Sequence, residues 1–460
     1  MREVGNGKWE VEGTSQGESA SPQSPVPSRP IRLLVVTYYF PPSGGAGVQR
    51  PTKWVKYLPE HGVEPVVLTV QAGAYPALDP SLEADVPPGT RVVRTAAPDP
   101  FGMYGRLTGR TRGEAVAART GTVGESAALP ERAARWIRAN LFVPDARVGW
   151  VPFAVRAARR LHAAAPVDAV LTTGPPHSAH LVGRALSRSL RLPWVADLRD
   201  PWTDIHYAGS LGRTRFAERF DARLEASVLR EADALVTVTA PLQDAFCARA
   251  GRPVALVRNG FDPDDFAGPP PPDEPFGVLY TGTLYDVPHA LLDAMQRLRA
   301  EGLDVPLRIV GAAPDALRAE AERRGVGDLV RVEPPVPHDR AVALMRASAV
   351  LLLTVEAWSY AAGVVPGKTY EYLAAGRPVV GIGPPDGDAA HVLRDAGGRM
   401  LAPDDVDGIA ATLRTYARHR EAREPGADVL DRYARPVQAG AVAALVRDAV
   451  ARHVCTNRRR

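Results

Sequence analysis

A lysine and a glutamate stand one helical turn apart in GVVPGKTYEYLAAGRPVVGIG, residues 363–383. The preceding Pro-Gly pair indicates a helix start and Gly376 indicates its end, so Lys368 and Glu371 should lie on one side of the helix. Lys368 could there bind a diphosphate group, and Glu371 could accept hydrogen bonds from the hydroxyl groups of a ribose. The alternative is an ordinary surface ion pair between these two residues.

A glycine-rich stretch near the N-terminus, YYFPPSGGAGVQR at residues 38–50, follows the apolar run IRLLVV. Gly44, Gly45 and Gly47 would let backbone N–H groups approach an anion or a sugar hydroxyl closely at the end of a strand. The stretch does not fit a dinucleotide fingerprint, because its third glycine position is Arg50 and the next strand ends LTVQ without an acidic residue. A glycine-rich connection that binds no ligand is the remaining alternative.

Two further polar segments come directly after predicted strands. In TTGPPHSAH, His177 lies near the start of a helix, and in VADLRDPWTD, Asp197, Arg199 and Asp200 stand where an apolar strand stops. Because the carboxyl ends of parallel strands share one edge of a sheet, these four side chains are candidate catalytic residues in a cleft. The alternatives are a solvated or packed cap for His177 and a structural ion-pair cluster for the other three.

The elements that must position these residues alternate between short apolar runs and helical patterns. Before residue 261 the runs are IRLLVVT, EPVVLTV, RVVRTA, VDAVLTT, PWVADL, ALVTVT and VALVRN, and after residue 276 they are GVLYTGT, LRIVGA, LVRVEP, AVLLLTVE and PVVGIG. Such alternation is typical of a mostly parallel sheet covered by helices on both faces. The sequence therefore predicts an α/β protein with two Rossmann-like, doubly wound domains that face a ligand-binding cleft.

The domain boundaries are predicted from composition. Residues 1–30 are rich in Ser, Pro, Gly and Gln and indicate a disordered leader, and residues 261–276 are a proline-rich linker. They delimit an N-terminal domain at 31–260 and a C-terminal domain at 277–430, which is followed by a helix and a basic tail at 431–460.

Composition also restricts the partners and the compartment. A formal charge of +4 without an aromatic-interleaved basic patch gives no indication of nucleic-acid binding. The cysteines Cys247 and Cys455 have no metal-ligand spacing and no apolar stretch is long enough to cross a membrane, so a cytoplasmic protein is expected. Residues 105–140 carry seven arginines against three glutamates, which suits a lid, peripheral contact with the anionic inner face of a membrane, or a solvated insertion.

The order of these motifs resembles the retaining GT-B glycosyltransferases of family four, over roughly residues 31–399. The resemblance is carried by YYFPPSGGAGVQR, GPPHSAH, PWVADLRDPW, LVTVTAPL, VRNGFDPDDF, LYTGTL, LRIVGA and PGKTYEYLAAGRPVV. It implies that the N-terminal domain binds a glycan, lipid-linked or small-molecule acceptor and that the C-terminal domain binds a nucleotide-sugar donor. It also implies transfer with retention at the anomeric carbon, without a cofactor and without an essential Mg²⁺ ion.

The resemblance gives a role to the residues that match each motif. His177 would line the sugar site, Arg199 and Asp200 would stand at a strand end where the family often has His-Asp, and Asp197 precedes them on the same strand. Asn259 and Gly260 match the turn that closes the N-terminal domain. The implied donor-binding residues are Gly44, Gly45, Gly47, Thr283, Lys368, Thr369 and Glu371.

The chain departs from the family pattern at two places on the donor side. Glu371 matches the second glutamate of a Glu-x7-Glu element, but the first position is Gly363. The segment GTLYDVPHA, which follows the first C-terminal strand, lacks the usual Arg and Lys for the diphosphate, and Lys368 could supply that charge. A sugar-nucleotide epimerase or hydrolase of the same fold, or a noncatalytic nucleotide-sugar-binding protein, are therefore alternatives.

Two further expectations concern turns. The Asp-x-Asp matches at Asp262 and Asp386 lie in Pro/Gly-rich turns and indicate turn chemistry rather than a metal site. If the glycine-rich stretch contacts the reacting sugar phosphate, Gly45→Val should abolish turnover with the melting temperature nearly unchanged.

Overall fold

The computed structural model of the chain describes residues 29–45, 47–71, 75, 77–97, 136–205, 212–356, 361–418 and 426–458. The predicted leader up to residue 28, the predicted insertion before Trp136 and the last two residues of the predicted tail lie outside these ranges. None of the described helices is both long enough and apolar enough to cross a membrane.

The N-terminal sheet has seven parallel strands in the order β5-β3-β1-β6-β7-β8-β9. The chain winds outward in both directions from the β1–β6 pair at the middle, as the prediction of a doubly wound domain requires. The strands are β1 (Ile31–Val36), β3 (Val63–Val70), β5 (Arg91–Thr95), β6 (Ala169–Gly174), β7 (Trp194–Leu198), β8 (Ala234–Thr237) and β9 (Ala255–Leu256).

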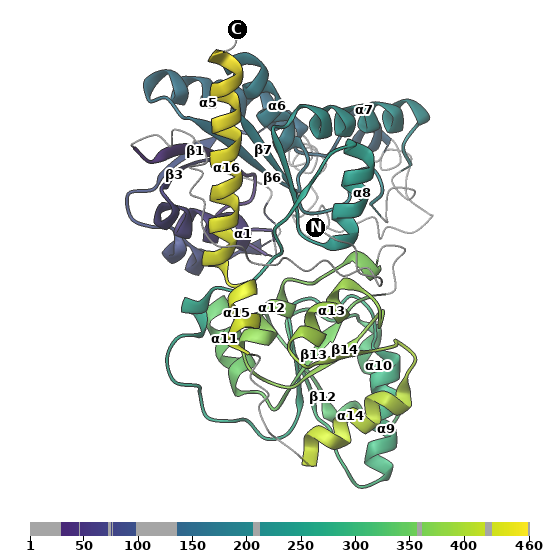
Figure 1. Cartoon of the computed structure of the whole chain (residues 1–460). Helices are drawn as coiled ribbons and strands as arrows, with labels where there is room; N and C mark the ends of the chain where they lie inside the picture. Colours follow the sequence, from purple (N-terminus) through teal and green to yellow (C-terminus); the bar gives the residue numbers. More distant parts are fainter. Residues whose placement is uncertain are drawn as a thin grey trace, which may run out of the picture.

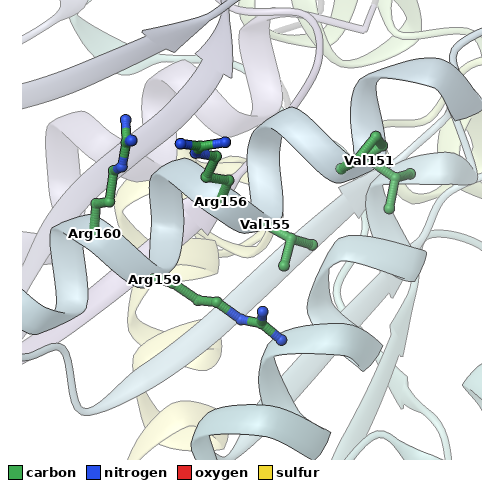
Figure 2. Close-up of a pocket in the computed structure, with 6 residues that line it drawn as sticks. Val151, Val155, Arg156, Arg159 and Arg160 are labelled. Carbon is green, nitrogen blue, oxygen red and sulfur yellow. The ribbon is translucent and has the colours of Figure 1, made fainter.

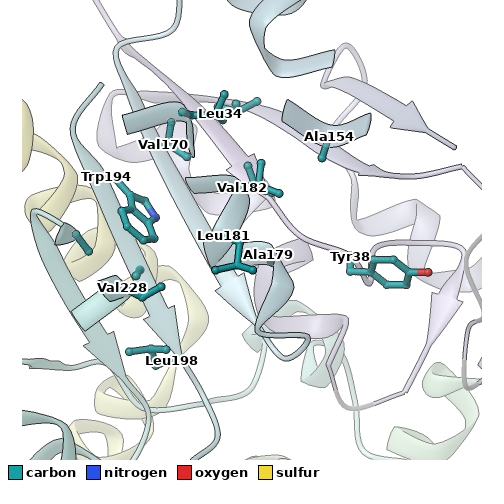
Figure 3. Packing of buried hydrophobic residues seen from close by; sticks show 14 of the residues in the cluster. Leu34, Tyr38, Ala154, Val170, Ala179, Leu181, Val182, Trp194, Leu198 and Val228 are labelled. Carbon is teal, nitrogen blue, oxygen red and sulfur yellow. The ribbon is translucent and has the colours of Figure 1, made fainter. Parts of the chain in front are cut away.

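Helices cover both faces of this sheet, which explains why its strands are continuous apolar runs. Leu34 and Val36 of β1 belong to a core with α5, α6, α7 and α8, part of which is shown in Figure 3. Leu33 and Val35 face the other side and pack with α1 and α16. The helices are α1 (Gln49–Tyr57), α5 (Val151–Ala164), α6 (Ser178–Leu190), α7 (Arg215–Glu231), α8 (Ala240–Ala250) and α16 (Arg435–Arg458).

The C-terminal sheet repeats this architecture with six parallel strands in the order β12-β11-β10-β13-β14-β15. Val278 and Tyr280 of β10 pack with α9, α10 and α14, whereas Leu279 packs with α11, α12, α13 and α15. The strands are β10 (Val278–Thr281), β11 (Leu307–Val310), β12 (Val330–Glu333), β13 (Val350–Thr354), β14 (Val379–Ile382) and β15 (Arg399–Leu401). The helices are α9 (His289–Ala300), α10 (Ala316–Arg323), α11 (His338–Ala347), α12 (Lys368–Ala374), α13 (Asp388–Asp395), α14 (Val406–Arg418) and α15 (Ala427–Tyr433).

Every apolar run named in the sequence analysis contains a strand, and the predicted α/β class with two doubly wound domains is confirmed. The short strand β15 was not predicted. The remaining short elements are β2 (Ser43–Gly44), which pairs antiparallel with β4 (Ala77–Leu78), and the 3-10 helices η1 (Leu58–His61), η2 (Pro80–Asp85), η3 (Val148–Trp150), η5 (Pro263–Phe266), η6 (Gly327–Leu329) and η7 (Ala361–Gly363).

The last helix, α16, leaves the C-terminal domain and packs on the N-terminal sheet (Figure 1). Its buried side chains Ala439, Val442, Ala443 and Val446 recur at three- and four-residue steps and join Leu33 and Val35 in one core. The sequence predicts a helix here, but its periodicity does not specify which of the two sheets it covers.

The chain crosses between the domains twice, and the two crossings lie side by side. The N–H of Phe261 donates to the Tyr433 carbonyl at 3.1 Å, and the N–H of Arg435 donates to the Phe261 carbonyl at 2.9 Å. A Cβ atom on Gly260 would stand 1.9 Å from the Tyr433 oxygen, so this approach requires glycine. Gly260, which the sequence analysis assigns to a closing turn, thus lies at the junction of both crossings.

Candidate active site

One arginine joins the three predicted loops of the N-terminal domain. Arg199 follows β7, and its guanidinium group donates to the carbonyl oxygens of Gly174 at 2.9 Å, Gly47 at 3.0 Å and Pro175 at 3.2 Å. The side chain is buried, and burial lowers its pKa. The glycine-rich stretch, the loop before His177 and the end of β7 are therefore held together, and we infer a positioning role for Arg199.

Asp197 also serves the architecture of these loops. Its carboxylate is fully buried. It accepts hydrogen bonds from Nη2 and Nε of Arg50 at 2.9 and 3.1 Å and from the Thr173 hydroxyl at 2.7 Å. Arg50 also donates to the carbonyl oxygens of Val257 and Arg258, both at 2.8 Å. Because all of these partners are protein groups, Asp197 fixes α1 against β7 and is shielded from a substrate.

Of the four predicted catalytic residues, Asp200 and His177 have polar side-chain atoms without a partner in the described part of the chain. Asp200 is half-buried and, in the ranges that the structure describes, forms no hydrogen bond or ion pair. The His177 ring stacks on Trp202 with 4.5 Å between centroids, and its Nδ1 has no partner among the described residues. Burial lowers the pKa of His177, while the charges of Asp145 and Asp200 act in the opposite direction. A neutral imidazole with a free nitrogen can exchange a hydrogen bond with a hydroxyl group.

On the donor side, Lys368 begins α12 and reaches the turn after β10. Its Nζ lies 3.7 Å from the centroid of the Tyr280 ring and 3.3 Å from where a Cβ atom on Gly282 would stand. Burial lowers the pKa of Lys368 to about 8, against the opposing charges of Glu356 and Glu371. Within the described part of the chain Nζ has no hydrogen-bond or ion-pair partner. A half-buried ammonium group without a counterion is partly desolvated, so an anion placed here would be stabilised.

Local packing explains why α12 lies against this turn. The Tyr372 hydroxyl accepts a hydrogen bond from the N–H of Thr281 at 3.1 Å, which ties the helix to the end of β10. Gly282 has φ of +100° and Gly311 has φ of +144°, and a Cβ atom on Gly311 would stand 2.0 Å from the Gly282 oxygen. The adjacent ends of β10 and β11 can therefore be this close only as glycines.

Glu371 connects the two domains. Its Oε1 accepts a hydrogen bond from the Gln49 side chain of α1 at 3.3 Å and lies 4.0 Å from Nδ1 of His338. Burial would lower the pKa of His338, but the hydrogen bond with Asp265 and the charge of Glu371 raise it to about 8. The glycine-rich stretch of the N-terminal domain, which leads into Gln49, is thus adjacent to the predicted donor helix.

The other predicted donor residues lie in different environments. Gly44 belongs to β2, Thr283 is exposed on the turn after β10, and Thr369 is fully buried, so that its hydroxyl faces the core rather than a ligand. Gly363 ends η7 and provides no side chain, as the sequence already implies.

Two residues near the site were missed by the sequence analysis. Glu356 follows β13, and burial together with the charge of Asp286 raises its pKa, while the charge of Lys368 lowers it. Its position after the run AVLLLTV is the same strand-end signal that identified Asp200. The sequence analysis considered Arg50 only because it stands where a dinucleotide fingerprint would have its third glycine. No local pattern indicates its partner Asp197, which is 147 residues away.

The Asp262 turn is an ion-pair cluster. Asp85, Asp262 and Asp265 lie close enough together to share a cation, but Nζ of Lys53 is within 2.6 to 3.1 Å of all three. Lys56 adds a contact with Asp262 at 2.8 Å. A divalent ion would have to displace the Lys53 ammonium group.

A shallow depression on the outer side of α5 is lined by Val151, Pro152, Val155, Arg156, Arg159 and Arg160 (Figure 2). Arg156 and Arg160 project to one side of the helix in this view, whereas Arg159 projects to the other. Arg159 donates to the Ser189 hydroxyl at 3.4 Å. Since these guanidinium groups do not converge, the depression is a poor candidate for the substrate site.

Two family models match the chain, one in each domain. Residues 110–265 match the model described as Glycosyltransferase Family 4, and residues 275–419 match the model described as Glycosyl transferases group 1. Both domains of the chain therefore resemble the family-four glycosyltransferases. The family resemblance stated from the sequence is confirmed, and the two models meet at the predicted linker.

Individual proteins are similar to the chain over part of its length or at low sequence identity. D-inositol 3-phosphate glycosyltransferase 1 of Catenulispora acidiphila is 30% identical over 173 residues, which is 34% of this chain and only 40% of that relative. Sucrose-phosphate synthase from Thermosynechococcus elongatus shares the fold with a TM-score of 0.57 at 15% identity, covering 91% of this chain and 98% of the other. The glycosyltransferase WaaG, involved in lipopolysaccharide biosynthesis, gives a TM-score of 0.54 at 16% identity, covering 89% and 99%.

Gly45 and Gly47 of the glycine-rich stretch should respond differently to substitution. Gly45 has φ of +97°, so Gly45→Val strains the backbone and should lower the melting temperature, contrary to our expectation from sequence. A Cβ atom on Gly47 would be 3.7 Å from Arg199 and from Tyr39, an ordinary contact distance. Gly47→Ala should therefore keep the melting temperature and reduce turnover, measured by thermal unfolding and donor consumption. Unchanged turnover of a stable Gly47→Ala variant would contradict a ligand contact at this stretch.

Proposed function

We propose that the protein transfers a sugar from a nucleotide-diphosphate sugar to a hydroxyl group of an acceptor, with the donor on the C-terminal domain. The observation that carries this proposal is the half-buried ammonium group of Lys368 beside the Gly282 turn, which among the described residues has no hydrogen-bond or ion-pair partner. It lies at the carboxyl end of the first strand of the domain, which is where doubly wound sheets bind nucleotides. Glu371, one turn further along α12, would accept hydrogen bonds from the ribose.

Lys368 would also stabilise the leaving group. Cleavage of the glycosyl phosphate bond builds negative charge on the departing diphosphate, and a preorganised cation lowers the barrier by stabilising that charge. We propose that this cation serves where other transferases use a metal ion, so that Mg²⁺ is not essential. Gly363 supplies no carboxylate for the donor sugar, and Glu356 is the acidic side chain whose charge acts on Lys368 from the neighbouring strand end.

On the N-terminal side, the half-buried Asp200 is the group proposed to contact the acceptor hydroxyl, and His177, whose Nδ1 is buried and has no partner among the described residues, is proposed to line the sugar site. Arg199 and Asp197 hold the loops around them in place. Transfer with retention at the anomeric carbon follows from the family pattern and is part of the proposal. A glycan or lipid-linked acceptor, reached by peripheral contact with an anionic membrane, is part of it too.

The first test is calorimetric titration and thermal unfolding of the full chain with UDP, GDP, dTDP and ADP, each with and without Mg²⁺. A nucleotide that binds only the folded protein raises its melting temperature by mass action. We expect one nucleotide to bind in the absence of Mg²⁺ and its sugar conjugates to be consumed only with an acceptor. Consumption without an acceptor would indicate an epimerase or hydrolase instead. No binding by any of the four would refute the proposed donor site.

A further inference from the structure

The outward face of α7 exposes large apolar side chains. Phe216 is 77% exposed and Phe220 is 43% exposed, and they lie one turn apart on the solvent side of the helix. The buried side of α7, with Leu224 and Val228, packs into the N-terminal core. Isolated exposed apolar residues are ordinary, but two phenylalanines on adjacent turns of one helix form a face that water solvates poorly.

A second exposed apolar segment lies against the start of α7. Residues 136–141 form a short helix in which Trp136 is 51% exposed, Ile137 is 42% exposed and Leu141 is 66% exposed. Asn140 in this helix donates to the Gly212 carbonyl at 3.3 Å and accepts from the N–H of Thr214 at 2.6 Å. The two segments are thereby joined at the N-terminal end of α7.

The charges on the exposed side of α7 are mainly positive. Arg219 and Arg223 share the helical face of Phe216 and Phe220, because these four residues recur at three- and four-residue steps. Within the described ranges neither arginine forms an ion pair, and Glu218, the exposed acidic residue nearby, points from another side of the helix. Arginine interleaved with phenylalanine is complementary to anionic lipid headgroups above an acyl layer.

The inner side of the same helix reaches the proposed acceptor site. Asp221 accepts a hydrogen bond from Nε1 of Trp202 at 2.7 Å, and the Trp202 ring stacks on His177. The backbone of α7, Asp221 and Trp202 thus lie between the exposed face and His177. A surface in this position would bring an acceptor carried by a lipid close to the groups proposed to bind it.

We propose that Phe216, Arg219, Phe220 and Arg223 of α7, with Trp136 and Leu141, dock the N-terminal domain on an anionic lipid bilayer. The phenylalanines and Trp136 enter the interface and the arginines bind lipid phosphates. Most of this surface lies outside the basic insertion considered from sequence, of which only residues 136–140, including Trp136, are described. The inference rests on the proposed function for the reason why the protein would bind a membrane. The binding itself can be measured without sugar transfer.

The test is sedimentation of the full chain with phosphatidylcholine vesicles, with and without phosphatidylglycerol. The wild type should bind only vesicles that contain phosphatidylglycerol, and the binding should weaken with salt. Removing two inserted phenylalanine rings in Phe216→Ala/Phe220→Ala should lower the partition coefficient about tenfold or more. Arg219→Gln/Arg223→Gln should lower it about tenfold and reduce the salt dependence. Melting temperatures should stay near the wild-type value, because all four side chains are exposed.

A matched control uses exposed residues of the C-terminal domain. Val332→Ala on β12 and Arg318→Gln on α10 should leave vesicle binding unchanged. Absence of binding by the wild type, or equal binding by the α7 variants, would refute the inference. Self-association that the phenylalanine variants abolish, without vesicle binding, would assign the surface to a second copy instead. Vesicle binding without sugar transfer would leave this inference standing while the proposed function fails.

Discussion

Replacing Lys368 by alanine is expected to weaken binding of the nucleotide diphosphate by about a hundredfold, with little change in melting temperature. Truncating one member of a buried, charge-paired contact typically costs 2–5 kcal/mol, and about 2.7 kcal/mol corresponds to a hundredfold. Stability should be nearly kept because, among the described residues, Nζ has no hydrogen bond or ion pair to lose, and the contact with the Tyr280 ring is offset by the cost of burying the charge. Calorimetric titration with the nucleotide identified above measures the affinity, and unchanged affinity would remove Lys368 from the donor site.

The pH dependence provides an independent reading of the same site. Since the pKa of Lys368 is lowered to about 8, the fraction of protonated Lys368 falls as the pH rises through that value. Nucleotide affinity should therefore decline above about pH 8, by up to tenfold for each further pH unit. Lys368→Arg serves as the control, because it keeps the charge at all of these pH values and should bind nucleotide without the decline. An identical decline in both proteins would assign the effect to another group.

Asp197→Leu is expected to lower the free energy of unfolding of the N-terminal domain by about 3–5 kcal/mol. The cause is Arg50, which is 1% exposed and would be left as a buried charge without a counterion. Urea unfolding followed by tryptophan fluorescence suits the measurement, because the Arg50 guanidinium lies 4.2 Å from the Trp54 ring.

The control for Asp197→Leu is the double variant Asp197→Leu with Arg50→Met, which replaces both charges by apolar groups. It should recover most of the lost stability, since an apolar pair of similar volume is often as stable as a buried ion pair. If the double variant is as unstable as the single one, the loss comes from packing and not from the unpaired charge.

The sequence predicted the strands well because buried parallel strands are apolar runs, and such runs are visible locally. It missed β15, whose three residues RML are too short for a pattern, and it could not assign α16 to the N-terminal sheet. Periodicity identifies the buried side of a helix but not the surface that it covers.

For the site, the sequence located the strand ends correctly, but it could not show which of the charged residues there are structural and which are available to a ligand. Asp197, Arg199 and Asp200 are three charged residues within four positions. Asp197 and Arg199 have protein partners far away in the chain, whereas the Asp200 carboxylate has no partner within the described ranges. Burial and distant partners decide this division, and neither is encoded in local spacing. The Gly45 backbone angle is likewise a property of the folded turn, which is why the sequence misjudged the cost of a side chain there.

The paired crossings at Phe261 and Ala434 determine how the two domains can move relative to each other. A single crossing would permit rotation of the domains in all directions. Two adjacent crossings joined by backbone hydrogen bonds should restrict rotation to one hinge axis. Side-chain contacts between the domains, such as Arg258 with Asp388 and Gln49 with Glu371, can open and close around that axis. We therefore expect any closure of the two domains to follow one arc, which would return Glu371 to the same position opposite α1.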